Sequence, residues 1–172
     1  MALPRLIEYI LSLDRPGGGN LAEHGLAQVI VPVFPAGLQL ASVLEPSASS
    51  FALIGYRLQF GRDMVPNAFS GTIQHYGRNQ YNGIVTQAAI EIELTSWMVI
   101  TRNIQVRYSF TNRTALNQRI ELMTFYVDIH SADDFDLIMA HLLALENGGA
   151  TALKEEAEDL LAKMRPARAR GT

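Results

Sequence analysis

The chain has 172 residues, enough for one domain with a substantial core, and 48% of them are hydrophobic, which excludes an intrinsically disordered protein. Its formal charge of −3 gives no general attraction to nucleic acids or acidic membranes, and the lack of cysteine excludes disulfides and thiolate chemistry. The apolar run at the start is interrupted by Arg5, Glu8 and Tyr9, so we expect no secretion signal and a cytoplasmic location.

The first residues are typical of a short amphipathic helix, predicted for residues 1–14. A helix this short is marginal in water, so its apolar face must dock on another surface. Gly17, Gly18 and Gly19 follow, and three consecutive glycines favour a flexible hinge over residues 15–25. Two alternatives stay open: the helix docks on its own domain, or the hinge lets it dock on a neighbouring subunit. The residues predicted to make this contact are Leu6, Ile7, Ile10 and Leu11.

Residues 26–130 are predicted to form antiparallel β-structure. Apolar and polar residues alternate along 52–60, 84–94 and 98–111, and each segment is predicted as one strand with one buried face. We count about seven or eight strands, enough for a sandwich or a barrel. The predicted fold class is α+β and mainly β: an antiparallel β-sandwich or barrel with a short N-terminal helix and two C-terminal helices.

Two segments of this region depart from simple alternation. Residues 28–34 are largely apolar and contain Pro32, which predicts an edge strand or a bulge because proline cannot donate to the ladder. Along residues 119–129 the apolar phase shifts by one residue between Leu122 and Met123, which indicates a bulge or a strand covered on both sides. Apolar positions on both faces also predict self-association.

Two helices are predicted over residues 131–165. Ser131 is a suitable N-cap, and Asp133 and Asp134 complement the helix dipole in the first turn. Residues 166–172 then form a basic tail, expected to be poorly ordered alone and to order against an acidic surface or nucleic acid. The contact residues predicted in and beside this tail are Arg165, Arg168 and Arg170.

Signatures of common enzyme classes are absent, including the G-x-S-x-G elbow, the phosphate-binding loop and H-E-x-x-H. Asp128 and His130 lie two apart on a predicted strand, so both share one face. They could bind a divalent metal, or Asp128 could orient His130 as a base; the alternative is that a strand ends there and a helix begins. Because a third and a fourth ligand are missing, we expect no metal and no cofactor.

The segment HYGRNQYNG, residues 75–83, combines two tyrosines, three side-chain amides, an arginine, a histidine and two glycines, and it has no aliphatic residue. Its glycines and asparagines are turn formers, which predicts a β-hairpin. Tyrosine, arginine and amide side chains also suit protein interfaces, so a contact loop in an assembly is a second interpretation. The residues predicted for that contact are Tyr76, Arg78 and Tyr81.

A hinged N-terminal helix, a β-rich body without enzyme motifs and a basic C-terminal tail together resemble small accessory proteins of bacteriophage particles, of the decoration, head–tail joining or baseplate type. The resemblance implies a non-enzymatic structural subunit that forms homo-oligomers, contacts other subunits, and enters a virion assembled in the cytoplasm. It implies no membrane contact, and contact with nucleic acid only through the tail. Two alternatives stay open: a β-sandwich that binds a small ligand or carbohydrate, and an enzyme that uses Asp128 and His130.

Overall fold

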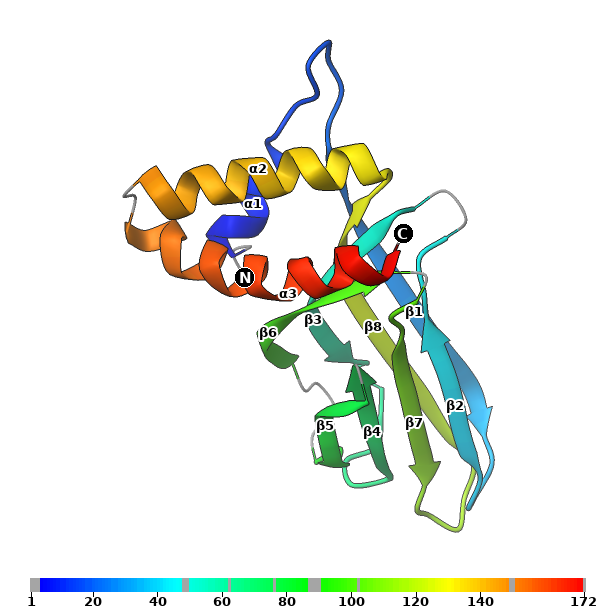
Figure 1. Ribbon diagram of the computed structural model, residues 1–172. Coiled ribbons are helices and arrows are strands. Elements are labelled where there is room, and N and C mark those ends of the chain that lie inside the picture. Colours follow the sequence, from blue (N-terminus) through cyan, green and yellow to red (C-terminus); the bar gives the residue numbers. More distant parts are fainter. Residues whose placement is uncertain are drawn as a thin grey trace.

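The computed structural model shows two packed β-sheets with three helices at one end (Figure 1). For residues 91–97, 151–152 and 166–171 only the backbone is described. The structure describes residues 4–47, 50–61, 63–75, 77–86, 91–101, 103–148 and 151–171.

Eight strands form two four-stranded sheets in which every pairing is antiparallel. Sheet 1 contains, in spatial order, β1 (Ala22–Phe34), β8 (Gln118–Ile129), β3 (Ala52–Phe60) and β6 (Glu91–Thr101). Sheet 2 contains, in spatial order, β2 (Gln39–Leu44), β7 (Val106–Asn112), β4 (Phe69–His75) and β5 (Arg78–Ile84). First pairs with eighth, second with seventh, third with sixth and fourth with fifth, which is the strand order of a jelly roll. The predicted fold class is confirmed.

The sandwich interior is filled from both sheets by large apolar side chains. Phe60 of sheet 1 meets Phe110 of sheet 2 edge-on, with 5.5 Å between the ring centroids. Tyr108 is buried there too, and its hydroxyl lies 2.8 Å from that of Thr124 across the sandwich. Burial raises the pKa of Tyr108 to about 12. The interior is therefore apolar with this polar pair satisfied within it.

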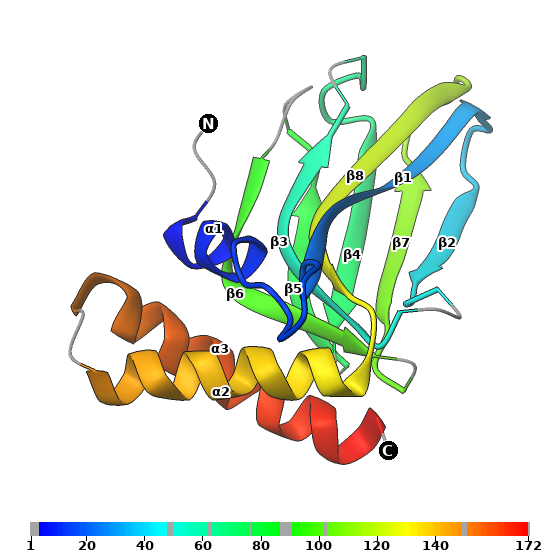
Figure 2. The same ribbon diagram turned by 90° about the horizontal axis from the view of Figure 1, so that it is seen from above.

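A second core lies on the opposite face of sheet 1, under a helical layer (Figures 1 and 2). The layer consists of α1 (Arg5–Leu11), α2 (Ala132–Gly148) and α3 (Thr151–Gly171). Ser131 caps α2 as predicted, accepting a 3.1 Å hydrogen bond from the backbone N–H of Asp134. The apolar stripes of the helices pack onto sheet 1, so this sheet is covered on both faces near the helices. The fully buried helical side chains include Phe135, Ile138, Leu142, Ala157, Leu160 and Met164.

This double cover explains the phase shift predicted in β8. Ile120 and Leu122 point into the sandwich, whereas Val127 and Ile129 point into the helical core, and all four are buried. Of the two alternatives, the strand covered on both sides is therefore correct for β8. A bulge occurs instead on its neighbour β3, where Tyr56 interrupts the ladder between Gly55 and Arg57.

Two strands predicted as single segments are divided. Residues 98–111 form the end of β6 and most of β7, which lie in different sheets, because Thr101 and Ile104 exchange backbone hydrogen bonds in a tight turn. Residues 84–94 likewise end β5 at Ile84 and begin β6 at Glu91; the part between, residues 87–90, lies outside the described residues. Both predictions of a single strand were wrong; at Thr101 and Ile104 the turn keeps the alternation of apolar and polar positions in phase.

The N-terminal helix docks on its own domain, the first of the two alternatives. Leu6, Ile7 and Ile10 are completely buried in the helical core, and Leu11 is partly buried beside them. A neighbouring subunit could receive this face only if α1 left its position.

The segment predicted as a flexible hinge is an ordered turn. The backbone N–H of Leu21 donates to the carbonyl of Leu13 at 3.0 Å, which closes the turn at its base. Gly17, Gly18 and Gly19 have φ of 105°, 100° and 94°, values that side chains disfavour. The three glycines therefore shape a specific turn, and the prediction of a loose joint needs this correction. Strand β1 follows this turn and begins at Ala22, before residue 26, where the β-region was predicted to begin.

The basic C-terminal segment is helical. Helix α3 continues to Gly171, past Pro166, so residues 166–171 of the predicted basic tail belong to it. Alanine and arginine are strong helix formers, and their propensity outweighs the single proline that suggested a helix end.

Candidate contact surface and groove

Most of one side of the sandwich, which is made by the edge strands β1 and β2, consists of uncharged residues. Residues 25–44 contain no Asp, Glu, Lys, Arg or His, and they include most of β1, the connecting loop and all of β2. The two strands lie on the same side of the molecule (Figure 1). We call residues 25–44 the uncharged side.

Exposed apolar residues concentrate on this uncharged side. Among the described residues, eight large apolar side chains are exposed, and five of them belong to it. Val29, Val31, Leu40 and Leu44 are only partly buried between the two edges. Exposed apolar side chains gathered along one stretch of a soluble protein make that stretch a candidate contact site. The five exposed residues are Leu26, Ile30, Val33, Leu38 and Val43.

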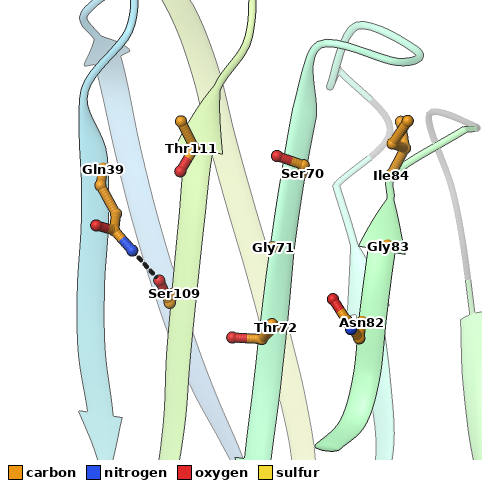
Figure 3. Close-up of a pocket in the computed structure, with 9 residues that line it drawn as sticks. All are labelled: Gln39, Ser70, Gly71, Thr72, Asn82, Gly83, Ile84, Ser109 and Thr111. Carbon is orange, nitrogen blue, oxygen red and sulfur yellow. Dashed lines mark hydrogen bonds between the residues drawn. The ribbon is translucent and has the colours of Figure 1, made fainter.

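A shallow groove crosses the outer face of sheet 2 (Figure 3). The register places Thr111 beside Ser70, and Ser109 beside Thr72, so four hydroxyl side chains form its floor. One wall is Gln39 of β2, whose amide donates a hydrogen bond to the hydroxyl of Ser109. The other wall is formed by Asn82 and Ile84 of β5.

The chemistry of this groove is neutral and polar. Its volume is about 380 Å³, and its lining contains hydroxyl and amide groups but no charged side chain. Such groups exchange hydrogen bonds with a polyhydroxylated ligand or a polar protein surface. An anion would lack a cationic partner here.

An aromatic cluster marks the place on sheet 1 where the helical cover ends. The ring of His24 and the hydroxyl of Tyr56 share a hydrogen bond, and both rings lie near Phe125. The guanidinium of Arg57 stacks over Phe125, 4.5 Å from the ring centroid. Burial raises the pKa of Tyr56, with the nearby charge of Arg57 acting the opposite way. The cluster joins β1, β3 and β8 and holds the bulged part of β3.

β4 and β5 form a hairpin in which His75 pairs with Arg78, and Gly77 in the turn has φ 70°. Tyr81 packs against Phe60, with ring centroids 5.9 Å apart, and is half-buried against the sandwich core. Arg78 is exposed, whereas Tyr76 lies outside the described residues. The predicted contact residues are thus separated: Tyr81 packs against the protein's own core, and Arg78 remains available.

His75 at the end of β4 is buried. Its Nε2 lies 2.9 Å from the carbonyl oxygen of Val99. Burial lowers the pKa of His75, which favours the neutral ring.

Asp128 and His130 are engaged by different partners. The carboxylate of Asp128 accepts a 2.9 Å hydrogen bond from the hydroxyl of Ser50. The Nε2 of His130 lies 3.6 Å from a carboxylate oxygen of Glu23. The arrangement in which Asp128 orients His130 as a base is therefore not formed. No group of three or more His, Asp or Glu side chains that could hold a metal ion occurs among the residues the structure describes.

Arg15 connects the N-terminal turn to the start of α2. Its guanidinium donates two hydrogen bonds of 2.7 Å to the carboxylate of Asp134, which also accepts one from Ser131 at 2.7 Å. The hydrogen bond from Arg15 is the main reason that the pKa of Asp134 lies below its ordinary value. This contact fixes the turn on the helical layer.

At the other end of the helical layer, Arg165 lies 4.0 Å from Glu146 across the α2–α3 pair. The side chains of Arg168 and Arg170 lie outside the described residues, although their backbone belongs to α3. Within the described part of the chain, no helix is both long and apolar enough to cross a membrane.

Sequence reasoning missed both surfaces described above. The absence of charge along residues 25–44 was a readable signal for the first. The groove gave no local signal, because its floor comes from alternate residues of β4 and β7, which only the strand order brings together.

No protein-family model and no curated protein matches the chain. Among solved structures, that of the infectious bursal disease virus Gx strain is similar, with 14% identity over 65% of this chain and 33% of the other, at a TM-score of 0.34. The VP2 subviral particle of infectious bursal disease virus is 15% identical over 66% of this chain and 34% of the other, with a TM-score of 0.31. A chain of the disulfide-linked pili of Bacillus endospore appendages is 14% identical over 66% of this chain and 93% of the other, also with a TM-score of 0.31. The chain spans about one third of the length of the two viral proteins.

Proposed function

We propose that the protein is a non-enzymatic structural subunit of a symmetric assembly and acts through protein–protein contacts. A virus particle, of a bacteriophage or another virus, is the assembly that we favour. The jelly roll is used by viral capsid domains, and also by lectins and cupins, so the fold permits this function without choosing it. The choice rests on the surface.

The observation that carries the proposal is the uncharged side. Protein interfaces have an apolar centre depleted of charge, surrounded by a polar rim. Residues 25–44 supply such a centre, with five exposed large apolar side chains along two sheet edges. An exposed apolar surface beside free strand edges promotes aggregation of a monomeric protein, so we expect it to be covered by another subunit in an assembly.

Sedimentation velocity over a wide concentration range, followed by electron microscopy of the largest species, tests this proposal. We expect a concentration-dependent shift from monomer to a closed oligomer. Because apolar contacts are weakened little by salt, the association should persist at high ionic strength. A monomer at every concentration, with or without salt, would refute it.

The remaining predicted contact residues belong to the same proposal. Arg78 is exposed at the β4–β5 hairpin, and Arg165 is exposed on α3 beside Glu146. Substitution of either by glutamate should change contacts with other subunits without affecting the fold, because exposed substitutions have small effects on stability. Comparison of assembly yield for Arg78→Glu and Arg165→Glu would show which of them takes part.

A second candidate function is the binding of a neutral carbohydrate in the groove on sheet 2. The four floor hydroxyls and the amides of Gln39 and Asn82 favour it. Titration with a panel of neutral oligosaccharides, followed by NMR, should shift the amide signals of Ser70, Thr72 and Ser109. Ser109→Ala should remove the response, because it removes one floor hydroxyl and the partner of Gln39. No shift with any sugar would exclude this candidate for the panel used.

A further inference from the structure

β1 is a long strand with one free edge. It runs from Ala22 to Phe34 and pairs only with β8 in the part of the chain that the structure describes. Proteins usually protect such edges with charges, prolines, bulges or short strands. From Gly25 to Val31 this strand has no charge and keeps an unbroken ladder with β8; its irregularity and Pro32 come only beyond Val31. The central part of the edge is therefore unprotected.

The face of sheet 1 beside this edge is apolar where the helices do not cover it. Leu26 and Ile30 are 48% and 44% exposed. Leu26 pairs with the half-buried Phe125, and Gln28 pairs with the half-buried Met123. These four apolar side chains form a strip along the free edge.

Polar groups lie within and beside the strip and are already paired with each other. Gln28 donates a 2.8 Å hydrogen bond to Glu121, which also receives one from Arg119 at 2.9 Å. On the opposite border, Arg57 donates to Gln59 at 2.8 Å. Apolar side chains next to polar groups that already have partners fit a protein interface.

We propose that the partner is a second copy of this chain, whose β1 pairs antiparallel with the first around a twofold axis. The two copies of sheet 1 would join into one continuous eight-stranded sheet. This inference rests on the proposed assembly function and specifies the strand through which two subunits bind each other. Around a twofold axis centred on Gln28, Leu26 of each copy lies opposite Ile30 of the other. The symmetry therefore gives two Leu26–Ile30 pairs, one on each side of the axis.

Self-pairing requires that identical strands meet without repulsion, because a twofold contact brings each residue near its own equivalent. Like charges opposite each other destabilise a strand pair, and residues 25–34 have none. A nucleic acid would need cations along this strip, and a strongly charged protein would need opposite charges; the strand offers neither. The composition of the edge thus fits its own copy.

The test uses two double variants of opposite charge, Leu26→Lys/Ile30→Lys and Leu26→Glu/Ile30→Glu. Both positions are exposed, so the variants should fold, which far-UV circular dichroism and thermal unfolding would verify. In sedimentation velocity each variant alone should associate at least about tenfold more weakly than the wild type, because like charges face each other across the axis. An equimolar mixture of the two should recover association, because lysine then faces glutamate. The matched control is Val65→Lys, at a residue that is 47% exposed in the β3–β4 loop and should leave association unchanged.

Each other outcome decides against the proposal in a different way. If both double variants associate like the wild type, the β1 contact is wrong, although the assembly function stands. If both lose association and their mixture does not recover it, the antiparallel twofold pairing is wrong. If the wild type itself is monomeric throughout, the assembly function and the β1 contact are refuted together.

Discussion

The contribution of α1 to stability can be measured with one buried residue. Ile10 is completely buried in the helical core, together with Leu6 and Ile7 on the same short helix. Ile10→Ala removes buried apolar surface and leaves a cavity, and such substitutions cost about 2–5 kcal/mol. The docked helix as a whole buries three such side chains, each worth roughly 1.5–3 kcal/mol before the entropy of ordering is subtracted.

Urea unfolding at a concentration where the protein is monomeric measures this cost. We expect Ile10→Ala to lower the unfolding midpoint with little change in the m-value. Leu116→Ala is the control, since Leu116 is 70% exposed and its truncation should change stability by less than about 0.5 kcal/mol. If Ile10→Ala left monomer stability unchanged but weakened assembly, α1 would dock on a neighbouring subunit, and the reasoning from its burial would be wrong.

Three further predictions concern the core, a sheet position and the N-terminal turn. Tyr108→Phe leaves the buried hydroxyl of Thr124 without its partner and should cost about 1–2 kcal/mol in thermal unfolding. Adding Thr124→Val should recover part of the loss; equal stability of the wild type and both variants would contradict this. Gly71→Ala would place a Cβ 2.3 Å from the carbonyl oxygen of Ser109 and should cost about 1–3 kcal/mol or more, while the control Gly83→Ala, with its nearest contact at 3.9 Å, should be near neutral by the same assay. The folded pKa of Asp134 lies below its ordinary value of 3.8, so its contribution to stability is present above pH 3.8 and is lost as the pH falls through the folded pKa. Arg15→Ala should therefore reduce the loss of stability in acid, measured by unfolding from pH 7 to pH 2. An unchanged pH profile would show that the Arg15–Asp134 pair does not contribute to stability.

The element types were predictable because each has its own local signal. Alternation identified β3 and β8, and a serine cap with acids behind it identified the start of α2. Connections were harder. Thr101 and Ile104 form a tight turn without a break in alternation, so one predicted strand proved to be two strands in different sheets.

The glycine run was misjudged for a different physical reason. Composition shows that glycine permits unusual backbone angles, but not whether the fold uses them. At Gly17 to Gly19 it does: the backbone of Leu21 closes the turn on Leu13, and Arg15 binds Asp134, which is remote in sequence. The contact with Asp134 forms only once α2 is packed beside the turn.

Sheet 1 performs two tasks, and the division between them lies within β1. Near its start the outer face is covered by the helices, with Ala22 buried; further along, Leu26 and Ile30 are exposed on the same face. The cluster of His24, Tyr56 and Arg57 around Phe125 lies at this boundary. Because the helices already cover the first part, pairing of β1 with the β1 of a second copy would satisfy the free edge and place Leu26 beside Ile30 of the other copy without moving any helix. The helical layer therefore stabilises the subunit, while the bare part of the same sheet remains available for contact with another.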